Sequence, residues 1–140
     1  MKTRTGDPLS VLIADDDPSS RETLREIVEP EGFHILLASD GEEAVDIVRG
    51  ELVHLVLLDM HMPKLTGLEA LQLVHQINAV LPCILVTANA NEEVVRQAFT
   101  VRAYSVIPKP VSKHVVLYTV VRALRVYDRL HDRDAPESRE

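Results

Sequence analysis

The sequence is poor in cysteine: Cys83 is the only one among 140 residues. A single cysteine excludes an internal disulfide and fits a reducing compartment. Cys83 lies in the apolar run "CILV", which favours a buried, inert thiol over a nucleophile. The chain also has no apolar run long enough to cross a bilayer and no cationic apolar leader. We therefore expect a soluble cytoplasmic protein without a membrane partner.

Basic residues are also in deficit, since 15 lysines and arginines face 22 acidic residues and the net charge is -7. This balance argues against a general nucleic-acid-binding surface. The pattern offers no helix-turn-helix or basic recognition helix either, so no direct nucleic-acid partner is expected. The sequence has no internal repeat and no low-complexity segment, and 46% of it is apolar. One domain with a real hydrophobic core is predicted.

Short apolar runs alternate with longer amphipathic ones, which predicts strands alternating with helices. The runs show little polar alternation, as is typical of strands buried on both faces. The expected strands are 9–14, 33–38, 53–58, 82–87 and 104–107, and the expected helices are 18–32, 40–50, 65–78, 91–101 and 112–132. This order predicts an α/β fold with a doubly wound, five-stranded parallel sheet. The strand order 2-1-3-4-5 suits this number of strands and this chain length.

Polar residues lie at or just past the ends of four of the predicted strands. Asp15, Asp16 and Asp17 follow the first strand, and Asp59 follows the third. Strand four ends on Thr87, and a lysine follows the fifth strand. In such sheets, ligands bind beyond the carboxyl ends of the strands. These side chains are therefore expected to meet at one edge.

A cluster of carboxylates without a clear set of cysteine or histidine ligands suits a hard cation, and Mg²⁺ first. Lys109 adds a positive charge and Thr87 a hydroxyl donor. A metal, an ammonium group and a hydroxyl around one carboxylate make a site for phosphoryl transfer, in which the carboxylate itself can be the nucleophile. Each residue taken alone also has an ordinary interpretation, such as helix capping by "DDDPS". The joint pattern carries the hypothesis.

These strand ends resemble those of the receiver domains of two-component response regulators. The similarity covers residues 9–125 and rests on four motifs in the right order, "VLIADDDPSSR", "LVLLDMHMPKLTG", "ILVTA" and "IPKP". The resemblance implies that Asp59 is the phosphoacceptor. It also implies that Mg²⁺ is bound by Asp15, Asp16, Asp59 and the backbone carbonyl of His61.

The resemblance assigns the phosphoryl oxygens to Thr87 and Lys109, helped by the backbone N–H groups of Met60 and Ala88. It implies a cis peptide bond between Lys109 and Pro110. Asp17 is not part of the acid pair in the family, and a helix-capping role is expected for it.

Three positions depart from the family's pattern. Val106 stands where receivers usually carry an aromatic residue that swings inward when the threonine moves, so a muted or different rearrangement is expected. Tyr104, two residues earlier, is expected on the same strand face. Pro108 precedes the lysine and removes a backbone donor, and Arg102 stands where the family often has glycine.

His61 and Asn89 occupy positions that tune dephosphorylation in the family. The imidazole of His61 could donate to a phosphoryl oxygen or orient the attacking water. It could also be a solvent-exposed side chain of which only the backbone matters. Both interpretations remain open on the sequence.

The last helix carries an apolar stripe that is expected to face the core: Val116, Val120, Leu124 and Tyr127. Receivers commonly use their last two helices and last strand as an interaction face. The implied partners are a sensor histidine kinase or phosphotransfer protein, and a second copy or a downstream protein on the face formed by 91–101, 104–107 and 112–132. The predicted organisation is an extension at 1–8, a receiver domain at 9–130 and a charged tail or linker stub at 131–140.

Two alternatives compete with this interpretation. An enzyme of the haloacid-dehalogenase type would use Asp15 as nucleophile and Asp17 as acid/base, but it leaves Asp59 unexplained. A receiver-fold interaction module that is never phosphorylated would not need the intact set of acids, threonine and lysine. The favoured interpretation is a signalling domain that catalyses its own phosphorylation and dephosphorylation, and that is otherwise no enzyme.

Overall fold

The computed structural model describes residues 1–3 and 5–133, with side chains up to residue 126. Five parallel strands form one sheet in the order β2-β1-β3-β4-β5, which confirms the predicted α/β fold and strand order. The strands are β1 (Ser10–Ala14), β2 (His34–Ala38), β3 (Leu55–Asp59), β4 (Cys83–Thr87) and β5 (Ser105–Pro108). Each matches an expected run to within two residues at either end.

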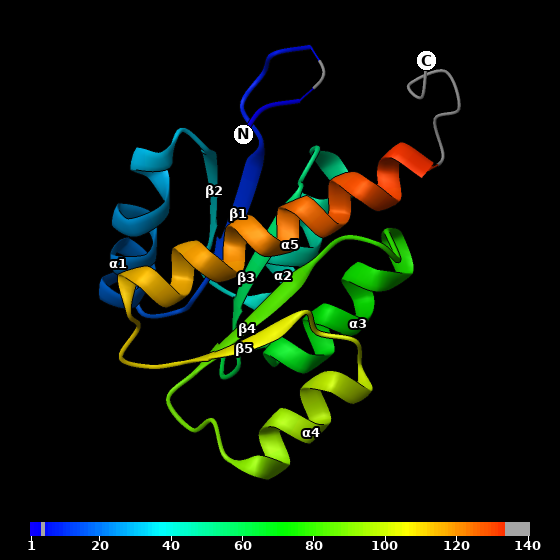
Figure 1. Cartoon of the computed structure of the whole chain (residues 1–140). Coiled ribbons are helices and arrows are strands. Elements are labelled where there is room, and N and C mark those ends of the chain that lie inside the picture. Colours follow the sequence, from blue (N-terminus) through cyan, green and yellow to red (C-terminus); the bar gives the residue numbers. More distant parts are fainter. Residues whose placement is uncertain (4, 134–140) are drawn as a thin grey trace.

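The helices cover both faces of the sheet (Figure 1). They are α1 (Pro18–Val28), α2 (Gly41–Gly50), α3 (Gly67–Ile77), α4 (Glu92–Thr100) and α5 (Lys113–Arg133), and a short 3-10 helix, η1 (Glu29–Glu31), follows α1. The predicted helix over 18–32 is therefore two elements, which end where Gly32 takes a left-handed conformation with φ 96°. Figure 1 shows α5 crossing one face of the sheet beside α1.

Two hydrophobic clusters lie on opposite faces of the sheet, and successive strand residues alternate between them. In β3, Leu55 and Leu57 pack toward α1 and α5, whereas Val56 and Leu58 pack toward α2 and α3. All four are fully buried. The three central strands, β1, β3 and β4, are buried along their whole length, as the uninterrupted apolar runs predicted, whereas the edge strands β2 and β5 are only partly buried.

Side chains at the helix starts fix where each strand-to-helix loop ends. Asp17 accepts a hydrogen bond from the N–H of Ser19 (3.2 Å), which confirms its predicted capping role. Thr66 and Glu69 form a reciprocal capping box at the start of α3. Such caps hold the loops at the carboxyl edge of the sheet in a defined register with the helices.

The apolar stripe of α5 faces the core as predicted. Val116, Val120 and Leu124 are all fully buried. The fourth predicted member, Tyr127, has a side chain outside the described part, and residues 134–140 of the expected tail lie outside it altogether. Within the described part of the chain, no helix has the length and apolar composition needed to cross a membrane.

Candidate functional site

The acids meet where β1 and β3 end side by side. Ala14 of β1 pairs with Leu58 of β3. The residues that come next, Asp15 and Asp59, therefore lie side by side. Asp15 is fully buried, Asp59 is 7% exposed and Asp16 is exposed. One carboxylate oxygen from each of the three lies within 4.8 Å of the others. The sheet thus brings together the three carboxylates that the sequence predicted at this edge.

Lys109 lies across the two buried acids. Its Nζ is 3.0 Å from Oδ2 of Asp15 and 3.1 Å from Oδ1 of Asp59. The backbone N–H of Lys109 donates to the carbonyl of Thr87 (2.8 Å), which extends the pairing of β4 with β5. The peptide bond between Lys109 and Pro110 is cis, as expected. Lys109, which follows β5, therefore offsets part of the negative charge of the buried pair.

The charges of this cluster act on one another strongly. Burial raises the pKa of Asp59; the hydrogen bond from Lys109 opposes that change, and the negative charges of Asp15 and Asp16 add to it. Burial alone would lower the pKa of Lys109, but its bonds to Asp15 and Asp59 raise it above the ordinary value. The cluster therefore holds a firmly charged ammonium group beside a carboxylate whose ionised form is destabilised.

Thr87 ends β4 and is fully buried. Its hydroxyl oxygen accepts from the backbone N–H of Asn89 (3.1 Å), so the hydroxyl proton is free to donate elsewhere. Among the described residues, the N–H of Ala88 has no acceptor. The N–H of Met60 donates to the carbonyl of Val86 (2.9 Å) and so belongs to the sheet. Of the two predicted backbone donors, Ala88 is the one that is free.

Close backbone packing fixes the loop after Asp59. Gly67, the first residue of α3, donates its N–H to the carbonyl of Met60 (2.8 Å). A Cβ atom at Gly67 would lie 2.5 Å from the carbonyl oxygen of Asp59. Only glycine allows α3 to start this close to the end of β3, so Gly67 sets the position of the acceptor backbone.

The family model of the response regulator receiver domain matches residues 11–121. The chain belongs to the response regulator receiver domain family. Receiver domains are signalling domains, and they generally bind Mg²⁺ at an acidic site. The matched range includes Asp15, Asp16, Asp59, Thr87 and Lys109.

Curated relatives and solved structures agree with this family. Response regulator RR06 of Streptococcus pneumoniae is 29% identical over 89% of this chain and 57% of the relative. The transcriptional regulatory protein CpxR of Escherichia coli is 32% identical over 82% of this chain and 49% of the relative. The chain thus spans about half the length of these relatives.

Solved receivers share the whole fold. A CheY-like receiver domain protein from Methanospirillum hungatei has a TM-score of 0.83 at 26% identity, and the match covers 88% of this chain and 98% of that one. CheY of Borrelia burgdorferi, solved in a CheX-CheY-BeF3-Mg complex, has a TM-score of 0.80 at 33% identity, and the match covers 84% and 90% of the two chains.

Family membership disfavours the dehalogenase-type alternative, and so does the position of its candidate nucleophile in this receiver domain. Asp15 has no exposed surface. One of its oxygens accepts from Lys109 and the other from the N–H of Asp17 (3.0 Å). The backbone carbonyl of Asp15 also accepts from Arg21 of α1 (2.8 Å). Both carboxylate oxygens of Asp15 are thus already held by hydrogen bonds, which does not suit a nucleophile that attacks a substrate.

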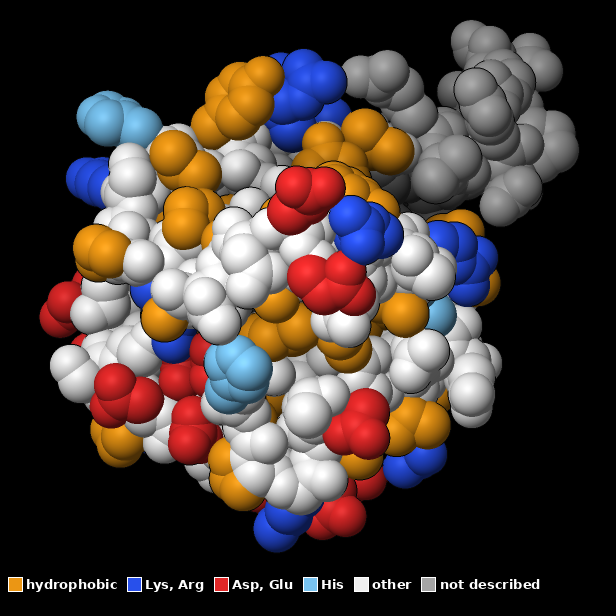
Figure 2. Space-filling model, turned by 90° about the horizontal axis from the view of Figure 1, so that it is seen from below, with side chains coloured by type: hydrophobic (Ala, Val, Ile, Leu, Met, Phe, Trp, Pro, Cys, Tyr) orange, Lys and Arg blue, Asp and Glu red, His pale blue; other side chains and the backbone are white. Residues whose placement is uncertain are grey.

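His61 lies on the outer side of the receiver's acidic site and is exposed. Figure 2 shows the molecule from the side of the strand ends, where acidic side chains gather with a basic side chain among them. The exposure of His61 fits both roles considered for it, so its contribution to signal lifetime stays a prediction.

Val106 and Tyr104 lie on different faces of the sheet, although the sequence placed them on the same face. Val106 is half-buried and packs against the cluster on the α3 and α4 side, whereas Tyr104 packs against the cluster on the α5 side. The expectation that both share one strand face was wrong, because β5 begins only at Ser105 and Tyr104 lies before the regular alternation. Tyr104 cannot replace the missing aromatic beside Thr87.

Proposed function

We propose that this chain is a phosphorylatable switch that receives a phosphoryl group on Asp59. The donor is the phosphohistidine of a sensor histidine kinase or phosphotransfer protein, or a small phosphodonor. A carboxylate oxygen of Asp59 attacks the phosphorus atom, an O–P bond forms, the N–P bond of phosphohistidine breaks, and the imidazole leaves. The observation that carries the proposal is the nearly buried Asp59 with Lys109 at 3.1 Å.

The chain's own groups can neutralise the transferring phosphoryl oxygens. Lys109 supplies the positive charge, and the free hydroxyl proton of Thr87 and the free N–H of Ala88 supply hydrogen bonds. Met60 was also expected to donate its N–H, but this group already donates to Val86. A contact from Met60 to a phosphoryl oxygen would be a second, shared bond.

The oxygen ligands fit Mg²⁺. Three carboxylates within 4.8 Å of one another provide only oxygen atoms, the ligand type that Mg²⁺ prefers. We propose Asp15, Asp16, Asp59 and the backbone carbonyl of His61 as the protein's ligands. When bound, Mg²⁺ would offset the repulsion of the acids and the charge of the phosphoryl group.

The proposed output face comprises α4, β5 and α5, where a second copy or a downstream protein would bind. Several large apolar side chains on these helices are well exposed: Phe99, Val115, Tyr118 and Val126. The guanidinium of Arg122 lies 5.8 Å from the ring centroid of Tyr118, in the range of a cation–π contact. An apolar surface with aromatic and arginine side chains is typical of interaction sites. We place the receiver domain at 9–130 and propose a cytoplasmic location.

Phosphorylation can be tested directly with acetyl phosphate and Mg²⁺, followed by borohydride reduction, which converts an acyl phosphate into an alcohol that mass spectrometry locates. We expect one modified residue, at position 59, and none in Asp59→Ala. Asp46→Ala is the matched control, because Asp46 is an exposed acid on α2 paired only with Arg49 (3.4 Å).

Two results would contradict the proposal. Modification at position 15 would restore the dehalogenase-type alternative. Absence of any modification, together with failure to bind Mg²⁺ or beryllofluoride, would favour the interaction module that is never phosphorylated. Size-exclusion chromatography with and without beryllofluoride tests whether the output face brings two copies together.

A further inference from the structure

Arg21 reaches back from the first turn of α1 to the end of β1. Its Nη1 donates to the backbone carbonyl of Asp15 (2.8 Å), across the loop that joins the two elements. Arg21 is half-buried, and within the described part of the chain it forms no ion pair, although the site carries three carboxylates. A guanidinium group that binds a neutral carbonyl beside three acids calls for an explanation in the loop itself.

The carbonyl that Arg21 binds belongs to the peptide unit between Asp15 and Asp16. Asp15 has no exposed surface, and Arg21 is the only donor to its carbonyl among the described residues. The other polar group of this peptide unit, the N–H of Asp16, has no acceptor in the same part of the chain. Because buried carbonyls are almost always paired, the hydrogen bond from Arg21 is the contact that fixes the plane of this peptide unit.

The plane of that peptide unit decides how the two acids are directed relative to each other. A peptide unit is planar, so its rotation changes ψ of Asp15 and φ of Asp16 together. The carboxylate of Asp15 is held separately, by Nζ of Lys109 (3.0 Å) and by the N–H of Asp17 (3.0 Å). The carboxylate of Asp16 has no hydrogen-bond partner among the described residues, and it is exposed. Its position relative to Asp15 therefore depends on the peptide plane.

The charge of Arg21 and its hydrogen bond act on a bound cation in opposite directions. A positive charge near the acids weakens their attraction for Mg²⁺, so charge alone predicts tighter binding once Arg21 is removed. Loss of a fixed peptide plane predicts weaker binding instead. Mg²⁺ demands nearly ideal octahedral geometry, whereas Ca²⁺ accepts flexible coordination. The two effects therefore differ in sign and in how they depend on the cation.

We propose that Arg21 is a positioning residue of the metal site, which holds the peptide unit between Asp15 and Asp16 so that both carboxylates face the cation. This inference rests on the proposed function, in which these acids bind Mg²⁺ together with Asp59. Arg21 itself contacts neither the cation nor the phosphoryl group, because it acts through the carbonyl of Asp15. A fixed angle between two ligands favours the cation with the stricter geometry, so Arg21 also makes the site more selective for Mg²⁺ over Ca²⁺.

The test is a titration of the full chain with Mg²⁺, and separately with Ca²⁺, followed by ¹H–¹⁵N correlation NMR. Arg21→Met removes the charge and the donor but keeps a long side chain. We expect its dissociation constant for Mg²⁺ to rise by roughly three- to tenfold, because the lost support of a ligand is partly offset by the lost charge. Its dissociation constant for Ca²⁺ should change by less than about twofold. In EDTA, the ¹⁵N–¹H heteronuclear NOE of the Asp16 amide should fall, since its peptide unit has lost its fixed contact.

Two further substitutions at Arg21 separate its hydrogen bond from its charge and from the fold. Arg21→Gln is too short to reach the carbonyl of Asp15 and should weaken Mg²⁺ binding as Arg21→Met does, so the test does not depend on one variant folding. Arg21→Lys keeps the charge and a donor on a slightly shorter side chain, and it should bind Mg²⁺ within about twofold of the wild type.

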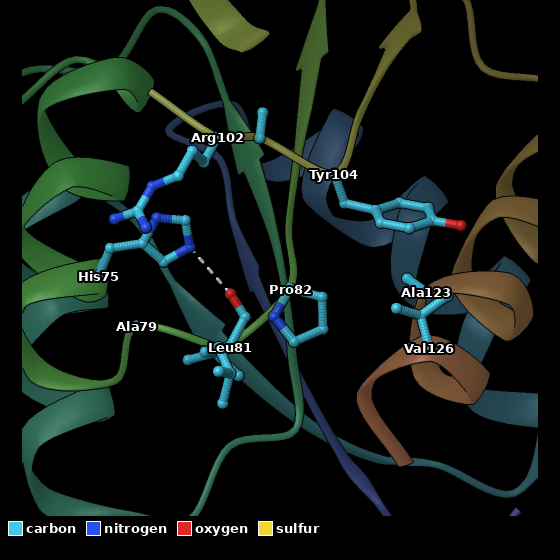
Figure 3. A pocket seen from close by; sticks show the side chains of 10 residues that line it. His75, Ala79, Leu81, Pro82, Arg102, Tyr104, Ala123 and Val126 are labelled. Atoms are coloured by element: carbon cyan, nitrogen blue, oxygen red, sulfur yellow. Dashed lines mark hydrogen bonds between the residues drawn. The ribbon is translucent and has the colours of Figure 1, made fainter. Parts of the chain in front are cut away.

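Two other arginines serve as controls. Arg25 lies on the same helix, is also half-buried and pairs with Glu22 and Glu29. Arg102 is exposed beside a hollow at the amino ends of β4 and β5, at the opposite end of the sheet from the acids (Figure 3). Arg25→Met and Arg102→Met each remove one positive charge without touching the β1–α1 loop, so both should bind Mg²⁺ within about twofold of the wild type.

Unchanged or tighter Mg²⁺ binding in Arg21→Met and Arg21→Gln would overturn the inference, because charge would then account for the whole effect. Equal weakening toward Mg²⁺ and Ca²⁺ would also overturn it, since a lost positioning contact should discriminate between the two cations. If the wild type itself does not bind Mg²⁺, the proposed metal site fails and this inference fails with it. Binding by the wild type together with unaffected variants refutes the inference alone, so the two failures are distinguishable.

Discussion

Replacing Asp59 by asparagine should stabilise this protein in the absence of Mg²⁺. Asp59 is 7% exposed and shares its site with Asp15 and Asp16. Asparagine has nearly the same shape but no charge. The substitution therefore removes the cost of burying the charge and its repulsion with two acids, and it loses only one ionic contact, with Lys109.

The magnitude follows from the distances. At an effective dielectric constant of about 20, unit charges 3.1 Å apart, as between Lys109 and Asp59, attract by about 5 kcal/mol. At the 4.8 Å limit that bounds the acid cluster, like charges repel by about 3.5 kcal/mol a pair. Asp15 contributes this repulsion in full, and the exposed Asp16 contributes less. Desolvation of the Asp59 carboxylate adds to the repulsion, so we expect a net gain of about 1–3 kcal/mol in the free energy of unfolding.

The gain should depend on pH in a defined direction. Burial raises the pKa of Asp59 in the native state, so the native protein holds this proton to a higher pH than the unfolded chain does. Where the native state binds more protons, stability falls as the pH rises. An unfolded aspartate titrates near pH 4. The stability of the wild type should therefore fall as the pH rises from about 4 through the higher pKa that Asp59 has in the native state. The advantage of Asp59→Asn should be small at the acidic end and complete at neutral pH.

Urea unfolding followed by circular dichroism, in EDTA at pH 4 and pH 7.5, measures both quantities. Asp46→Asn is the matched control: Asp46 is exposed and pairs only with Arg49 at 3.4 Å, so its loss should change stability by less than about 0.5 kcal/mol. If Asp59→Asn is no more stable than the wild type at pH 7.5, repulsion among the three acids does not destabilise the native protein. A gain of equal size at pH 4 would assign the effect to packing instead of charge.

Three other changes test separate parts of the structure. Gly67→Ala should lower the free energy of unfolding, measured in urea, by about 1–3 kcal/mol, because its Cβ would lie 2.5 Å from the carbonyl oxygen of Asp59. Gly50→Ala is the control, since its Cβ would meet nothing within 4 Å, and it should be neutral or stabilising. Arg102→Gly should raise the free energy of unfolding by about 1 kcal/mol, since φ 66° disfavours side chains with a Cβ; a loss would show that the arginine side chain supports the fold. His61→Ala should leave the lifetime of the acyl phosphate unchanged if only its backbone matters, and a several-fold change in the hydrolysis rate would assign its imidazole to the attacking water.

Local signals were enough to predict most of the fold. Strands buried on both faces leave uninterrupted apolar runs, and β3 shows this most clearly, with Leu55 to Leu58 all fully buried. Capping residues mark helix starts because they supply acceptors for free N–H groups, as Asp17 does for α1. The strand order came from alternation and chain length. The meeting of Asp15, Asp59 and Lys109 then follows, since parallel strands end at one edge.

The sequence pattern could not predict the hydrogen-bond partners of single backbone groups or the packing of single side chains. The pattern could not show that the N–H of Met60 donates to Val86, because this depends on how far the β3–β4 pairing extends. It placed Tyr104 on the face of Val106 by counting residues, although regular alternation begins only at Ser105. The left-handed turn before β5 left one signal in the sequence, because Arg102, with φ 66°, stands where the family often has glycine.

The resting contacts of Lys109 explain why the acids can be this closely packed before any cation or phosphoryl group arrives. Its ammonium group contacts both buried carboxylates at 3.0 and 3.1 Å, and its own pKa is raised by them. A group in that position offsets repulsion without occupying the exposed side of the cluster, where Asp16 lies. The same ammonium group is the nearest positive charge to any phosphoryl group on Asp59. One lysine can therefore stabilise the empty site and the phosphorylated site, which requires only that it shift from Asp15 toward the incoming oxygens.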